Sequence, residues 1–262
     1  NIFFTMNTSR IKSFLLICIG LTFIVPLAVL PNSFIFPFIV PKILLFRSLV
    51  LLMAAGYVAL LTVGWKEFRP RMTPVTVAVL LFGLSLALST FFGVDVYRSM
   101  WDNHERMLGL FTLLHYVLYY VIVTSVTKDE RTWERLGAWF LLAGSLVMLI
   151  AVIQKGNSDF LLNRGADRVS ATLGNPIYLG GYGLFILYLG LLLAWRAKKA
   201  SWQQWLRYGG AALGFLGIFL SGTRGSFVGL CAGVFVFVVI AAIHFWREPA
   251  VRRVTIVAVV LA

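Results

Sequence analysis

Residues 219–229, FLSGTRGSFVG, place an arginine among small polar residues inside an otherwise apolar part of the sequence. A charge at the centre of a bilayer is costly, so Arg224 needs a position where its guanidinium group meets water, lipid headgroups or an anion. Two other arginines have comparable surroundings, Arg106 in WDNHERMLG and Arg168 in RVSATLGNPIYLGGYG. Guanidinium groups bind phosphate through paired hydrogen bonds. Together, the three arginines would suit a phosphate-rich ligand.

The second of these stretches also contains a strong helix-start signal. Asn175 is a favourable N-cap residue, and Pro176 after it suits the first helical position. The unpaired N–H groups of such a helix start attract anions, so Asn175 joins the three arginines as a candidate residue for binding the phosphate-rich ligand. Asp102 and Glu105 have the spacing of a capping box, which predicts a further helix start beside Arg106.

The composition indicates that these residues belong to a membrane protein. Hydrophobic residues make up 60% of the 262 residues and charged residues only 13%, with a mean hydropathy of +0.89, far from the balance of soluble proteins. The net charge of +13 comes from short basic clusters between apolar runs, which argues for membrane orientation and against nucleic-acid binding. We expect one transmembrane domain over residues 1–262, an all-α polytopic helical bundle.

Eight apolar runs have roughly the length that crosses about 30 Å of hydrocarbon. The predicted spans are 14–30, 43–63, 74–92, 107–126, 136–153, 176–195, 205–220 and 226–245. In the last span Gly225, Gly229 and Gly233 are spaced by four, which predicts a small-residue stripe for helix packing.

The basic residues orient these spans. With the N-terminus in the cytoplasm, most of the 23 Lys and Arg residues fall in inside segments, as the positive-inside rule requires. The fourth, sixth and eighth spans then run from outside to inside, and their starts share the outer face with Arg106, Arg168 and Arg224. The alternative is that these are ordinary helix starts whose arginines contact lipid headgroups.

The ends of the sequence suggest a longer protein. Asn1 is not an initiator residue, so Met6 is the expected start. Residues 254–262 are apolar but too short to cross a bilayer, and we interpret them as the start of a ninth span in a C-terminally truncated domain.

Three stretches of this sequence resemble the O-antigen ligase/polymerase superfamily of bacterial envelope enzymes. They are FFGVDVYRSMWDNHERMLGLFTLLH, SATLGNPIYLGGYGL and SGTRGSFVGLCAG, in the order and spacing of that family. The resemblance implies a multi-pass protein of the bacterial inner membrane that takes a glycan from undecaprenyl diphosphate at the periplasmic face. The acceptor would be a hydroxyl of lipid A–core, a growing polymer or a protein. The transfer would invert the configuration at C1 of the sugar and use neither a metal nor another cofactor.

The resemblance also assigns roles to residues. Arg224 matches the functional arginine of the family's turn and is the predicted catalytic residue, and Arg168 matches an arginine before the GNP segment. Arg106 lies in a recurrent family stretch without an assigned role. The family's proposed general base is a histidine in a large periplasmic loop nearer the C-terminus, which we expect beyond Ala262, so the chain as given is expected to be inactive.

Two other functions remain open from the sequence. The first is a membrane transporter of the kind labelled a bicarbonate transporter among relatives, although no predicted span contains an acidic residue. The second is a non-catalytic membrane scaffold. Among the three histidines, His115 and His244 are expected to be packing or interface residues, and His104 is a weak candidate base.

Overall fold

The computed structural model describes residues 2–31, 33–103, 105–162 and 167–244, and every regular element in this part of the chain is a helix. The prediction of an all-helical fold is confirmed. The long helices are α1 (Ile2–Thr22), α2 (Val40–Phe68), α3 (Pro74–Phe91), α5 (Leu110–Val126), α6 (Glu130–Gly156), α7 (Pro176–Arg196), α8 (Trp202–Ser221) and α9 (Arg224–His244). The short helices between them are η1 (Val25–Leu27), α4 (Val96–Trp101), η2 (Ser158–Phe160) and η3 (Ala171–Leu173).

Several of these helices suit a membrane. Five described segments are long and apolar enough to cross one, namely Thr8–Leu27, Val40–Phe68, Pro74–Phe91, Glu130–Gly156 and Pro176–Arg196. Helix α5 and the Arg224–Ile240 part of α9 are apolar but shorter. Each long helix overlaps one predicted span. The predicted end of the eighth span at Phe245 and the predicted ninth span, residues 254–262, lie outside the described residues.

Side-chain caps determine where many helices begin. The predicted cap of α7 is confirmed, because Oδ1 of Asn175 accepts a hydrogen bond from the backbone N–H of Ile177 at 2.9 Å. The predicted capping box is wrong. Asp102 follows the end of α4 with a φ of 62°, and α5 begins only at Leu110. Asp102 and its neighbour Asn103 instead bind backbone N–H groups within the turn that leads to α5.

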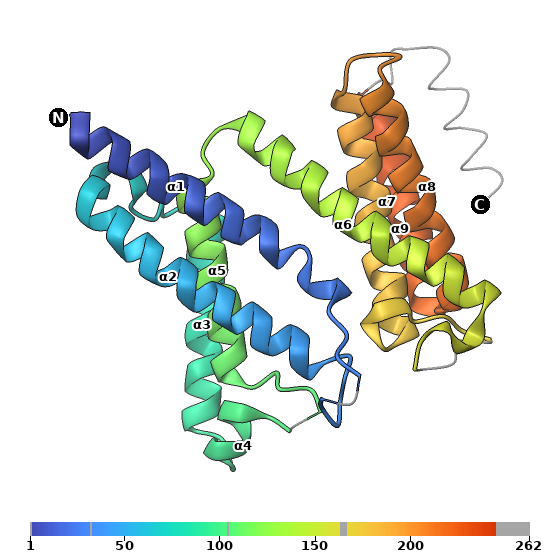
Figure 1. Cartoon of the computed structure of the whole chain (residues 1–262), viewed down its shortest axis with the longest axis horizontal. Coiled ribbons are helices and arrows are strands. Elements are labelled where there is room, and N and C mark those ends of the chain that lie inside the picture. The colour runs from blue at the N-terminus through green and yellow to red at the C-terminus, as the bar shows by residue number, and fades with distance from the viewer. Residues whose placement is uncertain (1, 32, 104, 163–166, 245–262) are drawn as a thin grey trace.

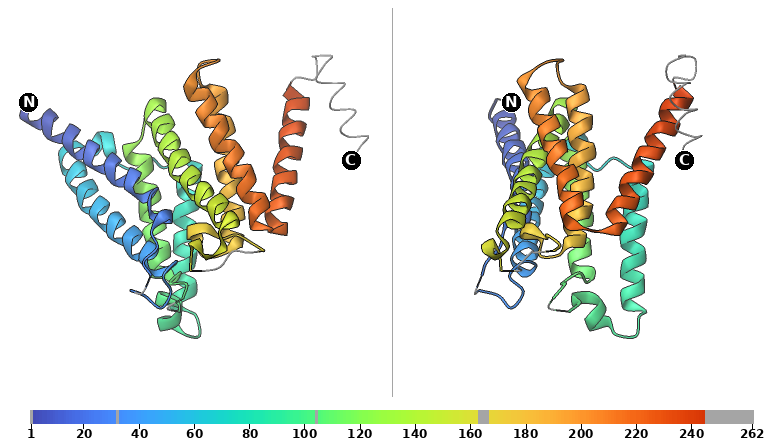
Figure 2. Two further views of the ribbon diagram at one scale, coloured as in Figure 1. Left: turned by 45° about the vertical axis from the view of Figure 1, so that its right-hand side comes forward. Right: turned by 90° about the vertical axis from the view of Figure 1, so that its right-hand side faces the viewer.

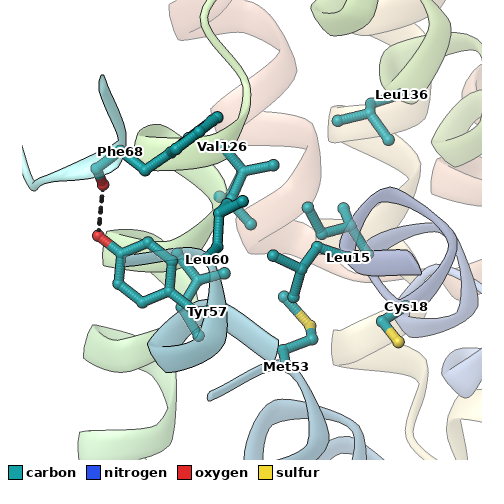
Figure 3. Packing of buried hydrophobic residues seen from close by; sticks show 11 residues of the cluster. Leu15, Cys18, Met53, Tyr57, Leu60, Phe68, Val126 and Leu136 are labelled. Atoms are coloured by element: carbon teal, nitrogen blue, oxygen red, sulfur yellow. Dashed lines mark hydrogen bonds between the residues drawn. The ribbon is translucent and has the colours of Figure 1, made fainter. Parts of the chain in front are cut away.

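The helices form two packed groups (Figure 1). In the first, α1, α2 and α5 bury a cluster that includes Leu15, Met53, Leu60 and Val126 (Figure 3). Tyr57 also belongs to this cluster, and its hydroxyl group donates to the carbonyl oxygen of Phe68 at 2.8 Å. In the second group, α6 and η3 pack against α7, and α7 packs closely against α8.

Glycines allow the backbones of α7 and α8 to touch. A Cβ atom on Gly183 would lie 2.8 Å from the carbonyl oxygen of Gly214, and one on Gly214 would lie 2.6 Å from the backbone nitrogen of Leu187. Small residues of this kind drive helix association in membranes, where burial of apolar surface contributes little. The predicted stripe on α9 acts similarly in part, because Gly229 and Gly233 face the side chains of Leu184 and Tyr188 on α7.

The connections between helices alternate between two ends of the molecule (Figure 2). The α1–α2, α3–α5, α6–α7 and α8–α9 connections lie toward one end, opposite the α7–α8 connection at the top of both views. We call this lower end the site end. The starts of α5, α7 and α9 lie there, and they carry or follow the three predicted arginine segments.

Candidate functional site

Arg168 joins two connections at the site end. Its Nε donates to the backbone carbonyl of Ser221 at 3.1 Å, and its Nη2 donates to the hydroxyl group of Thr223 at 3.2 Å. The next residue, Val169, donates its backbone N–H to the carbonyl of Leu220 at 3.0 Å. The segment before α7 is therefore attached directly to the turn that precedes Arg224. We call this contact region, Arg168 with residues 221–224, the arginine junction.

The turn of the arginine junction has a specific backbone shape. Gly222 ends α8 with a φ of +57°, a conformation that favours glycine. A Cβ atom on Gly222 would lie 3.4 Å from Cγ of Arg168. The hydroxyl group of Thr223 donates to the carbonyl of Pro176 at 3.1 Å, which fixes the turn on the first turn of α7. Arg224 is the first residue of α9 and is exposed. Arg224 thus belongs to a helix start, and helix starts stabilise anions.

Gly180 on α7 lets the two serines of the turn region approach. A Cβ atom at this position would lie 2.7 Å from Oγ of Ser221 and even closer to Oγ of Ser226. Both serines are buried, whereas a Cβ atom on the neighbouring Gly181 would meet nothing within 4 Å. The GNP segment and the SGTRGS turn, which are about fifty residues apart in sequence, therefore depend on each other for packing.

Asn175 has a structural role at this site. Its Oδ1 is occupied by the N–H of Ile177, so the side-chain oxygen belongs to the helix cap. Only the amide NH₂ group retains donors for a ligand. Its predicted role in diphosphate binding stays a prediction, now restricted to that group.

Arg106 lies on a separate cavity of about 500 Å³ at the site end. Arg168 and Arg224 are not among the residues that line it. The cavity wall comes from the start of α2, from Tyr116 on α5 and from the first half of α7, with apolar and aromatic residues predominating. These residues are Phe38, Ile39, Ile43, Leu108, Leu173, Ile177, Tyr178, Tyr182 and Phe185. The expected common pocket for three arginines is thus divided into the arginine junction and this cavity.

The cavity contains a second cation that the sequence interpretation did not select. Nζ of Lys42 donates to three backbone carbonyls, those of Ala28 at 2.7 Å, Phe38 at 2.5 Å and Thr172 at 2.7 Å. The ammonium group therefore ties the α1–α2 connection to η3, just before Asn175. The sequence shows only a lysine beside Pro41 at the start of an apolar run. Its hydrogen bond to the carbonyl of Thr172 could not be predicted, because the two residues are 130 positions apart.

The histidines provide no base at the site among the described residues. His115 is buried in α5, with Nδ1 2.6 Å from the carbonyl oxygen of Phe111, its ring packed on Phe111 and Nε2 without a partner. This agrees with the predicted packing role. His104 and the predicted catalytic loop beyond Ala262 lie outside the described residues, and nothing is described of the side chain of His244.

Comparison with known proteins adds no relative. No protein-family profile, no curated protein and no solved structure matches the chain at a significant level. The resemblance to the O-antigen ligase/polymerase superfamily therefore stays a prediction from the three sequence stretches.

Proposed function

We propose that the protein is a membrane glycosyltransferase of the O-antigen ligase type. It would transfer a glycan from undecaprenyl diphosphate to a hydroxyl group of lipid A–core, a growing polymer or a protein. The observation that carries this proposal is the arginine junction, because Arg168 binds the turn that leads directly to Arg224. A guanidinium group and a helix start at one place match the requirements of a diphosphate leaving group.

In the proposed reaction the acceptor oxygen forms a bond to C1 of the sugar while the bond between C1 and the diphosphate oxygen breaks. The hydroxyl proton goes to a general base, and undecaprenyl diphosphate leaves with the extra negative charge. Arg224, exposed at the start of α9, would stabilise that charge as it develops. Arg168 would hold the turn with its Nε and Nη2 hydrogen bonds and contribute a second fixed positive charge.

The neighbouring cavity supports a lipid-linked donor. Its wall is mainly apolar and aromatic and also includes Arg106, whereas Lys42 contributes positive charge but has its three donors occupied by backbone carbonyls. An isoprenoid chain needs apolar surface, whereas the adjoining phosphate groups need cations. The first turn of α7 separates the cavity from the arginine junction, since Tyr178 lines the cavity and Pro176 accepts a hydrogen bond from Thr223. We propose that the donor lies across this turn.

The proposal includes a membrane arrangement. All eight long helices would cross the bacterial inner membrane, with the N-terminus in the cytoplasm and the site end in the periplasm. Helix α5, with 17 residues, has a length of about 26 Å at 1.5 Å per residue, close to the hydrocarbon thickness. The inside segments would then contain most of the basic residues.

A reconstituted transfer assay tests the function. The complete gene product is placed in proteoliposomes with a radiolabelled glycan on undecaprenyl diphosphate and a lipid A–core acceptor. Arg224→Ala should lower transfer by roughly 100-fold or more, which is the usual loss for a preorganised charge-stabilising donor. Arg71→Ala, an exposed arginine outside the site end, is the matched control and should leave transfer unchanged. Equal transfer by wild type and Arg224→Ala would refute the catalytic role.

The acceptor is identified in the same assay. Lipid A–core, a second lipid-linked glycan and a protein with exposed hydroxyl groups are supplied one at a time, and product is followed by the label. Transfer to any one of them supports the reaction and names the subclass. If label stays on undecaprenyl diphosphate with every acceptor while the liposomes conduct an ion in the absence of the glycan, the transporter alternative is correct.

A further inference from the structure

Helix α2 contains a buried arginine that the proposed reaction does not use. Arg47 is 8% exposed and lies one helical turn beyond Ile43, which lines the cavity. Nε donates to the hydroxyl group of Thr112 at 3.0 Å, and Nη2 donates to that hydroxyl group and to the carbonyl of Met107 at 3.0 Å. The guanidinium carbon lies 5.0 Å from the centre of the Phe111 ring. All of these partners are uncharged.

A buried arginine with uncharged partners needs a reason to persist within an apolar bundle. Ionisable residues in membrane helices are costly, and they usually mark a function. Packing alone does not require a charge, since well-packed apolar residues can replace even a buried ion pair without loss of stability. The reason for Arg47 must therefore lie in what its hydrogen bonds hold.

The hydrogen bonds of Arg47 hold the turn between α4 and α5. Met107 has a φ of +49°, which is uncommon for a residue with a side chain, and its carbonyl accepts from both Arg47 and Thr112. A Cβ atom on Gly109 would collide with the backbone of Met100 and Trp101, so the turn folds tightly back on α4.

The same turn carries Arg106. Asn103 accepts a hydrogen bond from the backbone N–H of Arg106 at 2.8 Å, and Asp102 accepts one from Leu108 at 3.1 Å. These two bonds are exposed and local, so they do not connect the turn to another helix. Arg47 provides that connection, since it reaches the residue directly after Arg106 from α2.

We infer that Arg47 is a positioning residue whose guanidinium fork fixes the turn at residues 105–109 and thereby keeps Arg106 on the cavity. The structural part of this inference stands alone, whereas its consequence for catalysis rests on the proposed function. Arg47 does not itself line the cavity. Its effect on a ligand would pass through the position of Arg106.

Spin-label distance measurements test the structural part. Labels are placed on Glu105→Cys in the turn and on Trp195→Cys near the far end of α7, both exposed, after replacing Cys18 and Cys231 by alanine. Double electron–electron resonance on the protein in nanodiscs should give one narrow distance distribution with Arg47 present. Arg47→Met should lose it and give a broad or multiple distribution. Lys66→Met, which removes an exposed cation from the other end of α2, should retain the narrow distribution.

A second variant covers the case in which Arg47→Met fails to fold. Thr112→Val removes the hydroxyl group that links Arg47 and Met107 but retains the arginine and the side-chain volume. It should broaden the same distribution to a smaller extent. A distribution as narrow as that of Lys66→Met, in whichever of these two variants folds, would overturn the inference.

A double-mutant cycle tests the consequence for catalysis. Arg47→Met should lower transfer by roughly 10- to 100-fold, the loss expected from a misplaced binding group. Because both residues would act as one unit, Arg47→Met combined with Arg106→Ala should be no slower than the slower single variant. If the double variant instead showed the product of the two single losses in transfer rate, Arg47 would not act through the position of Arg106. Absence of transfer in every protein, wild type included, would count against the proposed function instead, and the distance measurements would still decide the structural part.

Discussion

The arginine junction and the cavity are neighbouring regions that arrange their cations differently. At the junction, Arg168 donates hydrogen bonds to a backbone carbonyl and a hydroxyl group of the turn. The buried Ser221 and Ser226 pack against Gly180. At the cavity, Lys42 and Arg106 line a volume of about 500 Å³ with mainly apolar walls. The junction therefore holds the turn before Arg224 by hydrogen bonds, whereas the cavity offers space for a bulky apolar group. A lipid diphosphate needs both.

The first turn of α7 lies between these two regions and contacts both. Pro176 accepts the hydrogen bond of Thr223 from the junction, while Ile177 and Tyr178 line the cavity. Lys42 contacts the carbonyl of Thr172 just upstream. A change in either region should therefore affect the other through the start of α7.

The largest expected effect comes from filling the close contact at the junction. Gly180→Val places methyl groups where the oxygens of Ser221 and Ser226 lie, and overpacking of this kind costs about 1–3 kcal/mol in stability. We expect transfer to be lost and the melting temperature in detergent to fall. Gly209→Ala on α8 is the matched control, because its added methyl group meets open space and Gly209 does not line the cavity. Equal melting temperatures and transfer rates for the two variants would contradict the described packing.

The next effect concerns the planar shape of the Arg168 side chain. Arg168→Lys keeps the charge, but one ammonium group cannot reproduce the fork between the Ser221 carbonyl and the Thr223 hydroxyl group. We expect transfer to fall by roughly 10-fold, the factor that corresponds to about 1.4 kcal/mol of lost transition-state stabilisation. Full activity with lysine would show that charge alone matters at this position. The two hydrogen bonds from Arg168 to the turn would then not be needed for transfer.

A smaller effect on transfer is expected from Lys42 at the cavity. Lys42→Met removes three hydrogen bonds from a charged donor, each of which typically contributes about 1.5–3 kcal/mol. Stability should fall because the α1–α2 connection is released from η3, and transfer measured on the remaining folded protein should fall only a few-fold. Lys66→Met serves as the control on the same helix. A loss of transfer as large as that of Arg224→Ala would place the catalytic charge in the cavity instead.

The smallest effect is expected outside both regions. Tyr188→Phe removes the hydrogen bond from α7 to the carbonyl of Leu230 on α9, at 3.0 Å. Its loss should lower stability by about 0.5–1.5 kcal/mol. Transfer should stay within two-fold of wild type, because the start of α9 is fixed separately by Thr223. A strong loss of transfer would mean that the whole of α9, not its first turn, positions Arg224.

Local sequence patterns predicted the structural features that depend on residues near one another in the chain, namely helices, one helix cap and a turn. Apolar run lengths located the long helices, and the Asn175–Pro176 pair located the start of α7, because capping and helix formation act within a few residues. The small residues around Arg224 predicted a tight turn, and Gly222 adopts the backbone conformation expected there. The capping-box spacing of Asp102 and Glu105 was misleading, since the Asp102 carboxylate caps a turn and not a helix.

Contacts between distant segments could not be predicted in this way. Lys42 finds an acceptor 130 residues away, and Arg47 finds one 60 residues away. Nothing in the neighbourhood of either residue specifies those partners. The same limitation explains why Arg106 was expected in a common pocket with Arg168 and Arg224, because a shared end of the bundle does not determine which cavity a side chain lines.

The central claim is that the arginine junction holds a diphosphate at the site end. The most direct measurement is the affinity of the complete gene product in nanodiscs for farnesyl diphosphate, farnesyl monophosphate and farnesol. We predict that the diphosphate binds at least roughly 10-fold more tightly than the monophosphate, and that Arg168→Ala and Arg224→Ala each reduce this preference by a similar factor. Equal affinity for the three lipids, or a diphosphate preference that both variants leave intact, would contradict the account.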